Sequence, residues 1–300
     1  MIVIIIYKYL YNFEEVVTLL KISKKTLKIG IIGYPISHSL SPLIHNYWFE
    51  KYNIDAEYLS LEIAPNCLES FFKEIHQYDL RGFNITIPHK VNVLDYVDKI
   101  DESAKTIGAV NCVTIKSDKS LIGSNYDSKG FMDSLINNYS ENIFNQKPVV
   151  VIGAGGASRA ILYSLINYGI KEIRLSNRTD KKSEVLKKYF GSAVKVIPWN
   201  EKKRSLNDCG LLINTTNQGM LGTDPLNMDI SQLPKEAIVI DLIYNPIDTD
   251  LIKRAKLRGN RTLNGLPMLV YQAIPAWESW FGIKPEVTKD LLDLLNKALE

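Results

Sequence analysis

Apolar runs alternate with segments of helical periodicity in the second half of the chain. The runs predict strands at 149–152, 171–175, 194–197, 210–213 and 238–241, and helices are expected between them at 157–168 and 180–190. This alternation is typical of a doubly wound parallel sheet with helices on both faces. Helical spacing also predicts three helices near the end of the chain, at 248–258, 266–281 and 287–299.

The first half of the chain has its own α/β pattern. Strands are expected at 28–33, 56–61, 82–87, 109–115 and 120–123, and helices at 65–78 and 91–100. Another helix is predicted to start at Ser41-Pro42, with Ser41 as the N-cap residue and Pro42 in the first turn. A helix at 127–139 is expected to connect the two halves. The fold class is therefore α/β, with an N-terminal α/β domain and a Rossmann-type doubly wound domain.

The stretch 149–161 reads VVVIGAGGASRAI and predicts a nucleotide site. Gly153 allows a tight turn, Gly155 lets the backbone approach a ligand, and the helix from Gly156 directs its free N–H groups at a diphosphate. Ser158 replaces the third glycine of the usual fingerprint and is small enough for close helix–strand packing. The alternative is a glycine-rich turn without a ligand. The candidate cofactor residues here are Gly153, Ala154, Gly155, Gly156, Ala157 and Ser158.

The turn after the second strand of this half favours NADP over NAD. An acidic residue about 20 residues past the glycines would mark NAD, but the segment here reads Ser176-Asn177-Arg178-Thr179. Arg178 suits a 2′-phosphate and can stack on adenine, and Lys182 adds charge one helical turn later. The alternative is a turn with a solvated arginine, in which Thr179 is simply the N-cap of the next helix.

Composition narrows the class of protein. The 300 residues are 46% hydrophobic and 23% charged, which is ordinary for a soluble globular protein. A net charge of +3 without a basic face carrying aromatics gives no support for nucleic-acid binding. The apolar run at 1–6 is too short for a membrane span or a signal peptide. Residues 1–26 are treated as an extension of unknown role, with a short helix expected at 14–25.

Cysteine and histidine usage argues against a metal centre. The three cysteines are far apart and form no C-x-x-C pair, which is typical of a reducing cytoplasm. The four histidines (His38, His45, His76 and His89) show no metal-ligand spacing, so no metal is expected. Neither a G-x-S-x-G motif nor a Cys/His nucleophile arrangement is present.

Six segments occur in the order found in the shikimate dehydrogenase family, and the chain resembles that family over about 28–285. They are 35–42 (PISHSLSP), 84–90 (NITIPHK), 107–111 (IGAVN) with 125–127 (NYD), the glycine loop, the Asn177-Arg178-Thr179 turn, and 264–273 (NGLPMLVYQA). The resemblance implies a substrate-binding domain at 27–126 and 266–300 and an NADP-binding domain at 127–265. It also implies cytoplasmic, NADP-dependent reduction of 3-dehydroshikimate to shikimate in chorismate and aromatic amino acid biosynthesis.

The same resemblance assigns roles to individual residues. Lys90 and Asp127 would form the catalytic pair, in which an acid protonates the forming alkoxide while hydride is transferred. Taken alone, Lys90 reads as a surface charge and Asp127 as an N-cap. The residues implied to bind substrate are Ser39, Ser41, Thr86, Asn111, Tyr244 and Gln272, and those implied to flank the nicotinamide are Gly265 and Met268. Each of these also reads as an ordinary capping, hydrogen-bonding or core residue.

Two positions depart from the family pattern beside Asp127. Tyr126 stands where the family usually has threonine, and Ser128 where a glycine is common. A tyrosine here is expected to narrow the substrate pocket or to move Asp127. The competing hypotheses are an NAD-dependent quinate/shikimate dehydrogenase and a catalytically weakened nucleotide-binding relative. The sequence leaves open whether the chain is a monomer or a homodimer, and which of Lys90 and Asp127 carries the proton.

Overall fold

The computed structural model describes residues 26–139 and 147–300, so the helix expected at 14–25 lies outside the described residues. The chain divides into two compact units. Of the described residues, unit 1 contains 26–126 together with Ala273–Ala298, and unit 2 contains 127–139, 147–272 and the last two residues. Each unit is built on one six-stranded sheet.

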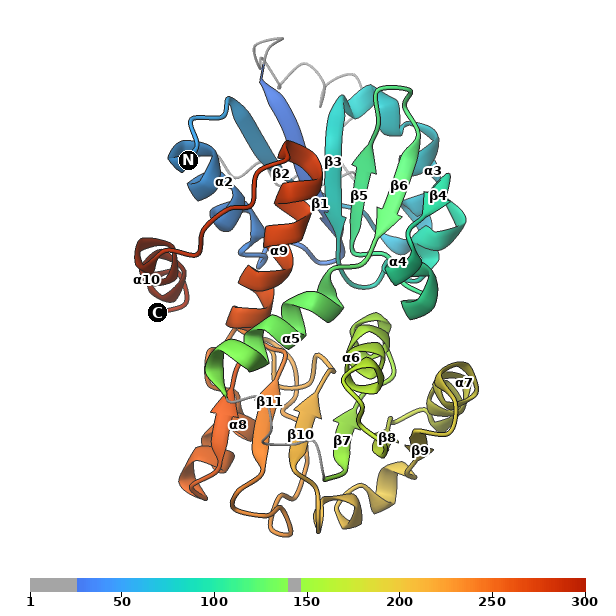
Figure 1. The fold of residues 1–300 in the computed structure, drawn as a ribbon, viewed down its shortest axis with the longest axis vertical. Helices are drawn as coiled ribbons and strands as arrows, with labels where there is room; N and C mark the ends of the chain where they lie inside the picture. Colours follow the sequence, from blue (N-terminus) through green and yellow to red (C-terminus); the bar gives the residue numbers. More distant parts are fainter. Residues whose placement is uncertain (1–25, 140–146) are drawn as a thin grey trace. The chain divides into compact units, whose positions relative to one another are not determined.

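The sheet of unit 1 is mixed and has the strand order β2-β1-β3-β5-β6-β4 (Figure 1). Its strands are β1 (Leu27–Gly33), β2 (Ala56–Glu62), β3 (Leu80–Ile85), β4 (Lys99–Ile100), β5 (Cys112–Ile115) and β6 (Leu121–Ser124). β1 is parallel to β2 and β3, whereas β5 is antiparallel to β3 and β6. The carboxyl ends of β1 and β3 therefore lie at the same edge as the start of β5.

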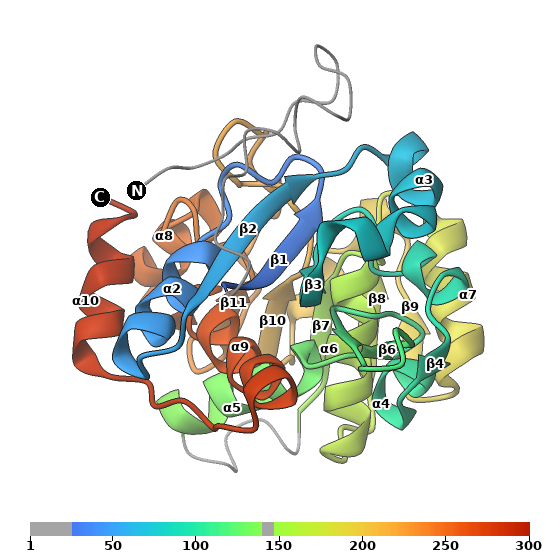
Figure 2. The same cartoon turned by 90° about the horizontal axis from the view of Figure 1, so that it is seen from above.

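Helices cover both faces of this sheet. They are α2 (Ser41–Lys51), η1 (Pro65–Cys67), α3 (Leu68–Lys73), η2 (Ile75–Tyr78), η3 (Asn92–Asp95), α4 (Glu102–Ile107), the second part of α9 (Leu266–Phe281) and α10 (Lys289–Lys297). Figure 2 shows α10 beside α2, where Tyr47 and Thr288 share a hydrogen bond of 2.6 Å between their hydroxyls. A glycine in β3 sets the packing of α9: a Cβ at Gly82 would lie 2.3 Å from Trp280 Nε1, which donates to Val113 O.

Unit 2 has a parallel sheet with the order β12-β11-β10-β7-β8-β9. The strands are β7 (Val149–Ile152), β8 (Ile173–Ser176), β9 (Val194–Val196), β10 (Leu211–Asn214), β11 (Ile238–Asp241) and β12 (Arg261–Leu263). The chain starts at β7, runs outward to β9 and then returns to the other side of β7. This is the doubly wound dinucleotide-binding topology, whose switch point lies between β7 and β10.

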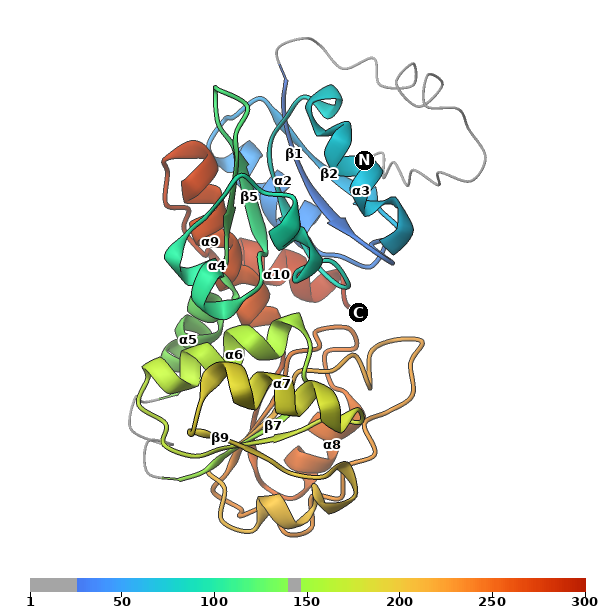
Figure 3. The same cartoon turned by 90° about the vertical axis from the view of Figure 1, so that its right-hand side faces the viewer.

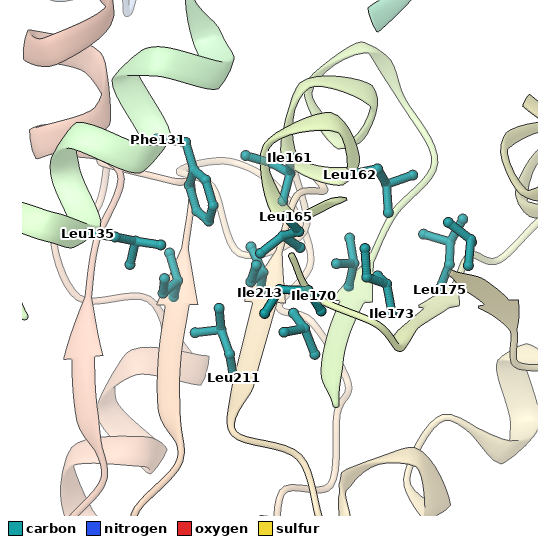
Figure 4. Close-up of a cluster of buried hydrophobic side chains, with 14 of the residues drawn as sticks. Phe131, Leu135, Ile161, Leu162, Leu165, Ile170, Ile173, Leu175, Leu211 and Ile213 are labelled. Carbon is teal, nitrogen blue, oxygen red and sulfur yellow. The ribbon is translucent and has the colours of Figure 1, made fainter. Parts of the chain in front are cut away.

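Two apolar layers enclose this parallel sheet. Its helices are α5 (Asp127–Asn138), α6 (Gly156–Asn167), η4 (Trp199–Glu201), η5 (Arg204–Leu206), α7 (Asp180–Phe190) and α8 (Asp250–Leu257). Alternate strand residues pack against α5, α6 and α7 on one face and against α8 on the other (Figure 3). Figure 4 shows the first layer, in which side chains of α5 and α6 gather over β10 and its neighbours.

Two local predictions for unit 1 were wrong. The helix expected at 91–100 is a 3₁₀ turn, η3, followed by the short strand β4, because Asp98 accepts a hydrogen bond of 2.7 Å from Leu121 N and ties the chain to β6. Ser41 is not the N-cap residue of α2, because Leu40 holds that position and Ser41 is the first residue of the helix. Ser39 Oγ instead accepts from Ser41 N at 3.3 Å.

The remaining differences concern the bounds of predicted elements and short elements that were not predicted, among them α4 and β12. The helical segment expected at 65–78 is broken into η1, α3 and η2, and the strand expected at 82–87 ends at Ile85. The strand β12 was not predicted. It has only three residues, and an Arg and a Thr among them obscure the apolar pattern.

Candidate active site

Five of the eight expected substrate and catalytic residues belong to unit 1, and they lie at the edge of the sheet described above. Ser39 and Ser41 follow β1, Thr86 and Lys90 follow β3, and Asn111 directly precedes β5. Asn111 is tied to β3 because its carbonyl oxygen accepts from Ile85 N at 2.8 Å. The edge thus brings together hydroxyls, an amide and an ammonium group, which suits a small, hydroxylated acid.

A buried hydrogen-bond network joins these segments. Tyr58 donates to Asn84 Oδ1 at 2.6 Å, and Asn84 Nδ2 donates to Asn111 O at 3.2 Å. Asn111 Oδ1 in turn accepts from Tyr126 N at 2.8 Å. The sequence reasoning missed Tyr58 and Asn84. Asn84 is a single polar residue inside the buried strand 82–85, which is the signal that would have identified it.

The turn that carries Lys90 is anchored on both sides. His89 is fully buried, and its Nε2 donates to Ile63 O at 2.6 Å. Burial, the larger effect, lowers the pKa of His89, so its imidazole is neutral at physiological pH. The carbonyl oxygen of Lys90 itself accepts from Val110 N at 2.7 Å. Lys90 is therefore held at the edge of the sheet by its own backbone and by its neighbour.

In unit 2, the glycine loop has the geometry that its sequence predicts. Gly153 has φ +112°, and a Cβ there would lie 2.5 Å from Thr215 Oγ1. A Cβ at Gly155 would meet nothing within 4 Å, so the space in front of this backbone is open. Ser158 is fully buried, shares a 2.6 Å hydrogen bond with Thr215, and accepts from Gly155 N at 3.2 Å. A larger residue at Ser158 would break this contact between the helix and β10's loop.

The turn after β8 presents two cations. Asn177 Nδ2 donates to Thr179 O at 2.9 Å and shapes the turn, while Thr179 is the N-cap residue of α7 without a capping side-chain bond. Arg178 and Lys182 are exposed. Among the described residues, neither takes part in an ion pair. The two cationic side chains could therefore bind a phosphate without first breaking an ion pair.

The other expected residues of unit 2 lie around α5, α9 and the loop after β11. Asp127 is the first residue of α5 and is 3% exposed. α5 and α9 touch one turn later, where a Cβ at Gly130 would lie 2.6 Å from Gln272 Cβ. Gly265 lies against the backbone of the β11 loop, since its N–H donates to Ile243 O at 2.9 Å. Tyr244 follows in that loop, and Met268 packs against the core under α5 and α6.

Asp241, which the sequence reasoning also missed, ends β11 and is fully buried. It accepts hydrogen bonds from Asn214 Nδ2 at 3.0 Å, Ile243 N at 3.2 Å and the Thr249 hydroxyl at 2.7 Å. Burial outweighs these bonds and raises the pKa of Asp241 to about 6. An acid at the end of a buried β-branched strand is the sequence signal for it.

The raised pKa predicts how stability depends on pH. The folded state holds the Asp241 proton more tightly than the unfolded state, and this difference stabilises the fold. The stabilisation is complete below about pH 4 and is lost as the pH rises through about 6. Ionisation then costs the fold up to about 3 kcal/mol. We expect Asp241→Asn to be at least as stable as the parent at pH 7 and to lack this part of the pH dependence. Urea unfolding at several pH values measures it, and a parallel loss of stability in both proteins would contradict it.

Two other kinds of feature are absent from the described residues. None of the helices in residues 26–139 and 147–300 has the length and apolar character to cross a bilayer. The same residues contain no group of three or more acids, histidines or cysteines arranged to hold a metal ion.

Comparisons with known proteins agree with this geometry. Residues 31–113 match the shikimate dehydrogenase substrate binding domain, and residues 137–256 match the shikimate / quinate 5-dehydrogenase domain. A "Shikimate dehydrogenase (NADP(+))" of Paramagnetospirillum magneticum is 41% identical over 269 residues, which are 90% of this chain and 98% of the relative. The chain belongs to the shikimate dehydrogenase family.

Solved structures of shikimate dehydrogenases and a related enzyme have the same fold. Shikimate 5-dehydrogenase from Thermus thermophilus, solved with NADP(H) and shikimate, has a TM-score of 0.80 at 30% identity and covers 91% of this chain and all of its own. Quinate dehydrogenase from Corynebacterium glutamicum, solved with NAD, has a TM-score of 0.81 at 25% identity and covers 91% and 99%. The α/β fold with a Rossmann-type unit is thus the fold of the shikimate dehydrogenase family.

The two departures from the shikimate dehydrogenase pattern have local partners. The phenol of the half-buried Tyr126 interacts with the side chains of Ser124 and Ser279, and burial raises the pKa of Tyr126. Its backbone N–H is bound to Asn111, as described above. The Ser128 hydroxyl is bound by Ser164 of α6 at 2.9 Å. Both substitutions therefore add contacts within their own units.

These contacts predict a mainly structural role for the tyrosine side chain. We expect Tyr126→Thr to lower the free energy of unfolding by about 1–3 kcal/mol, because a half-buried ring and its polar contacts are lost. We expect kcat/KM for shikimate to change by less than about threefold, since the Tyr126 N–H to Asn111 bond is a backbone bond. Urea unfolding and initial rates measure the two effects, and a tenfold change in kcat/KM with unchanged stability would refute the assignment.

Proposed function

We propose that the protein is an NADP-dependent shikimate dehydrogenase that reversibly reduces 3-dehydroshikimate to shikimate. The observation that carries the choice of cofactor is the turn after β8. Arg178 and Lys182 are exposed there, and the strand end lacks the acidic residue that would mark NAD. The glycine loop fits a dinucleotide, because Gly155 leaves open space before the N-terminus of α6. The naming of the 41% identical relative supports the same cofactor. Shikimate, the product of the reduction, would then be used in chorismate and aromatic amino acid biosynthesis.

The proposed division of labour follows the two units except at 266–272 and 299–300, which lie in unit 2 but belong to the proposed substrate-binding domain. The substrate-binding domain comprises 27–126 and 266–300, and the NADP-binding domain comprises 127–265. Cofactor contacts are proposed for Gly153, Ala154, Gly155, Gly156, Ala157, Ser158, Asn177, Arg178, Thr179, Lys182, Gly265 and Met268. NADP, when bound, supplies the nicotinamide that accepts or gives the hydride.

The residues of the chain supply substrate binding and proton transfer. Ser39 and Ser41 are suited to the substrate carboxylate, because two hydroxyl donors lie at the start of α2. Neutral donors and acceptors suited to the ring hydroxyls are supplied by Thr86, Asn111 and Gln272, and Tyr244 is a further carboxylate ligand. Lys90 and Asp127 are the proposed catalytic pair, which takes the hydroxyl proton during oxidation and returns it during reduction.

A four-way activity assay tests this function. The purified protein is offered shikimate or quinate, each with NADP or NAD, and formation of the reduced cofactor is followed by absorbance. We expect the highest kcat/KM for shikimate with NADP. Absence of turnover with every pair, from neutral to alkaline pH, would reject the proposal. A preference for NAD would favour the alternative, an NAD-dependent quinate/shikimate dehydrogenase. The structural similarity to the quinate dehydrogenase supports testing this alternative.

The proposal includes a cytoplasmic location. Cys67, Cys112 and Cys209 are all free, which supports a reducing compartment. It also includes a small-molecule substrate and no nucleic-acid or membrane partner. Sedimentation of the purified protein distinguishes a monomer from the homodimer that the sequence leaves open.

A further inference from the structure

Asp241 is a buried acid that the reaction does not use, yet it joins three segments at the cofactor edge of unit 2. Its Oδ1 accepts from Asn214 at the end of β10 and from Ile243 N in the loop after β11. Its Oδ2 accepts from Thr249, the N-cap residue of α8. None of the ion pairs within residues 26–139 and 147–300 includes Asp241. A buried carboxylate without a cation is unfavourable, so the presence of Asp241 is better explained by a role other than stability.

The loop that Asp241 fixes is the one on which Gly265 rests. Gly265 N–H donates to Ile243 O at 2.9 Å, and a Cβ at Gly265 would lie only 2.0 Å from Leu242 O. Any displacement of this loop would therefore displace Gly265. The glycine loop is held by different bonds, because Thr215, the residue after Asn214, donates to Ile152 O at 2.8 Å and bonds to Ser158 at 2.6 Å.

We propose that Asp241 is a positioning residue that sets the nicotinamide end of the cofactor site through Ile243 and Gly265. Its carboxylate does not touch the cofactor. It binds the Ile243 N–H and the Thr249 hydroxyl together, so the loop between them has one position. The adenosine end, at Arg178, lies on the β8–α7 turn and has no part in this network. The inference rests on the proposed NADP function and adds a residue to it.

Binding measurements on Asp241→Asn test this role, with two probes that separate the ends of the site. NADPH spans the whole site, whereas adenosine 2′,5′-bisphosphate reaches only the adenosine end. We expect the Kd of NADPH to rise by about tenfold or more, with the Kd of adenosine 2′,5′-bisphosphate unchanged and thermal stability at neutral pH not lowered. In kinetics, the KM for NADPH should rise while the KM for shikimate changes by less than about twofold.

Two results would overturn the role. The first is an NADPH Kd within twofold of the parent value. The second is an equal rise in the Kd of both probes together with a lower unfolding midpoint, which would indicate general disruption of the fold. Asp250→Asn is the matched control, because this exposed carboxylate is one residue beyond Thr249 and pairs only with Arg254 among described residues. If Asp241→Asn does not fold, Thr249→Val removes one of the same hydrogen bonds and is judged by the same results. Failure of the parent itself to bind NADPH would instead reject the proposed function.

Discussion

Lys90→Ala is expected to lower kcat for shikimate oxidation by about 10²- to 10⁴-fold, with less than about a threefold change in the KM for shikimate. The lysine stands on a turn anchored by His89 and by its own carbonyl bond to Val110, so removing its side chain should leave the edge of the sheet in place. Initial-rate kinetics with NADP in excess measure the change. An unchanged kcat would remove Lys90 from the mechanism.

Two further variants separate proton transfer from charge. Lys90→Arg keeps the positive charge, but a guanidinium does not give up its proton near neutral pH. We therefore expect it to be nearly as slow as Lys90→Ala. Lys73→Ala is the matched control, because this exposed lysine on the surface of α3 pairs, among the described residues, only with Glu69, and the variant should leave kcat unchanged. Activity retained in Lys90→Arg would show that charge alone is needed.

The same kinetics can show whether Lys90 and Asp127 act as one unit. The effects of residues that act together are not additive. We expect the double variant Lys90→Ala/Asp127→Asn to be no slower than the slower single variant by more than about threefold. Fully multiplicative losses would indicate that the two side chains contribute separately.

How much could be predicted from the sequence depended on how local the signal was. Strand β7, the glycine loop and α6 were predicted almost residue for residue, because a β-branched run, a glycine turn and a helical repeat follow one another without interruption. The segment 91–100 has apolar residues at helical spacing, and the helix predicted for it was nevertheless wrong. Its conformation is decided by the pairing of Lys99–Ile100 with β6, a tertiary contact that the spacing does not record.

The site divides in the same way. Residues in recognisable segments, such as Lys90 and Arg178, were identified, and their roles remain predictions. Asn84 and Asp241 were missed because each is a single polar residue in or at the end of a buried stretch of strand, and Tyr58 was missed because it lies in a half-buried strand among other polar residues. Their importance lies in which donors they meet, and those donors come from other segments of the chain. Such partners become visible only when the strands are side by side.

Arg178→Asp is expected to lower kcat/KM for NADPH by about 100-fold or more. The change removes charge-assisted hydrogen bonds to the 2′-phosphate, worth about 3 kcal/mol, and places a carboxylate beside that phosphate. With NADH the loss should be much smaller, because an acid at this position can bind the ribose 2′-hydroxyl. The exposed position of Arg178 and its lack of an ion pair among the described residues mean that the fold should not suffer.

The decisive quantity is the ratio of the two kcat/KM values, measured with both cofactors on the same preparation. Arg204→Asp, a charge reversal at another exposed arginine of unit 2, is the matched control for long-range electrostatics and should leave that ratio unchanged. Arg178→Lys should give an intermediate ratio, since an ammonium retains the charge but not the paired hydrogen bonds. Equal losses with NADPH and NADH would mean that Arg178 does not read the 2′-phosphate. Specificity would then rest on other residues of the turn, of which Lys182, one helical turn further, is the next to test.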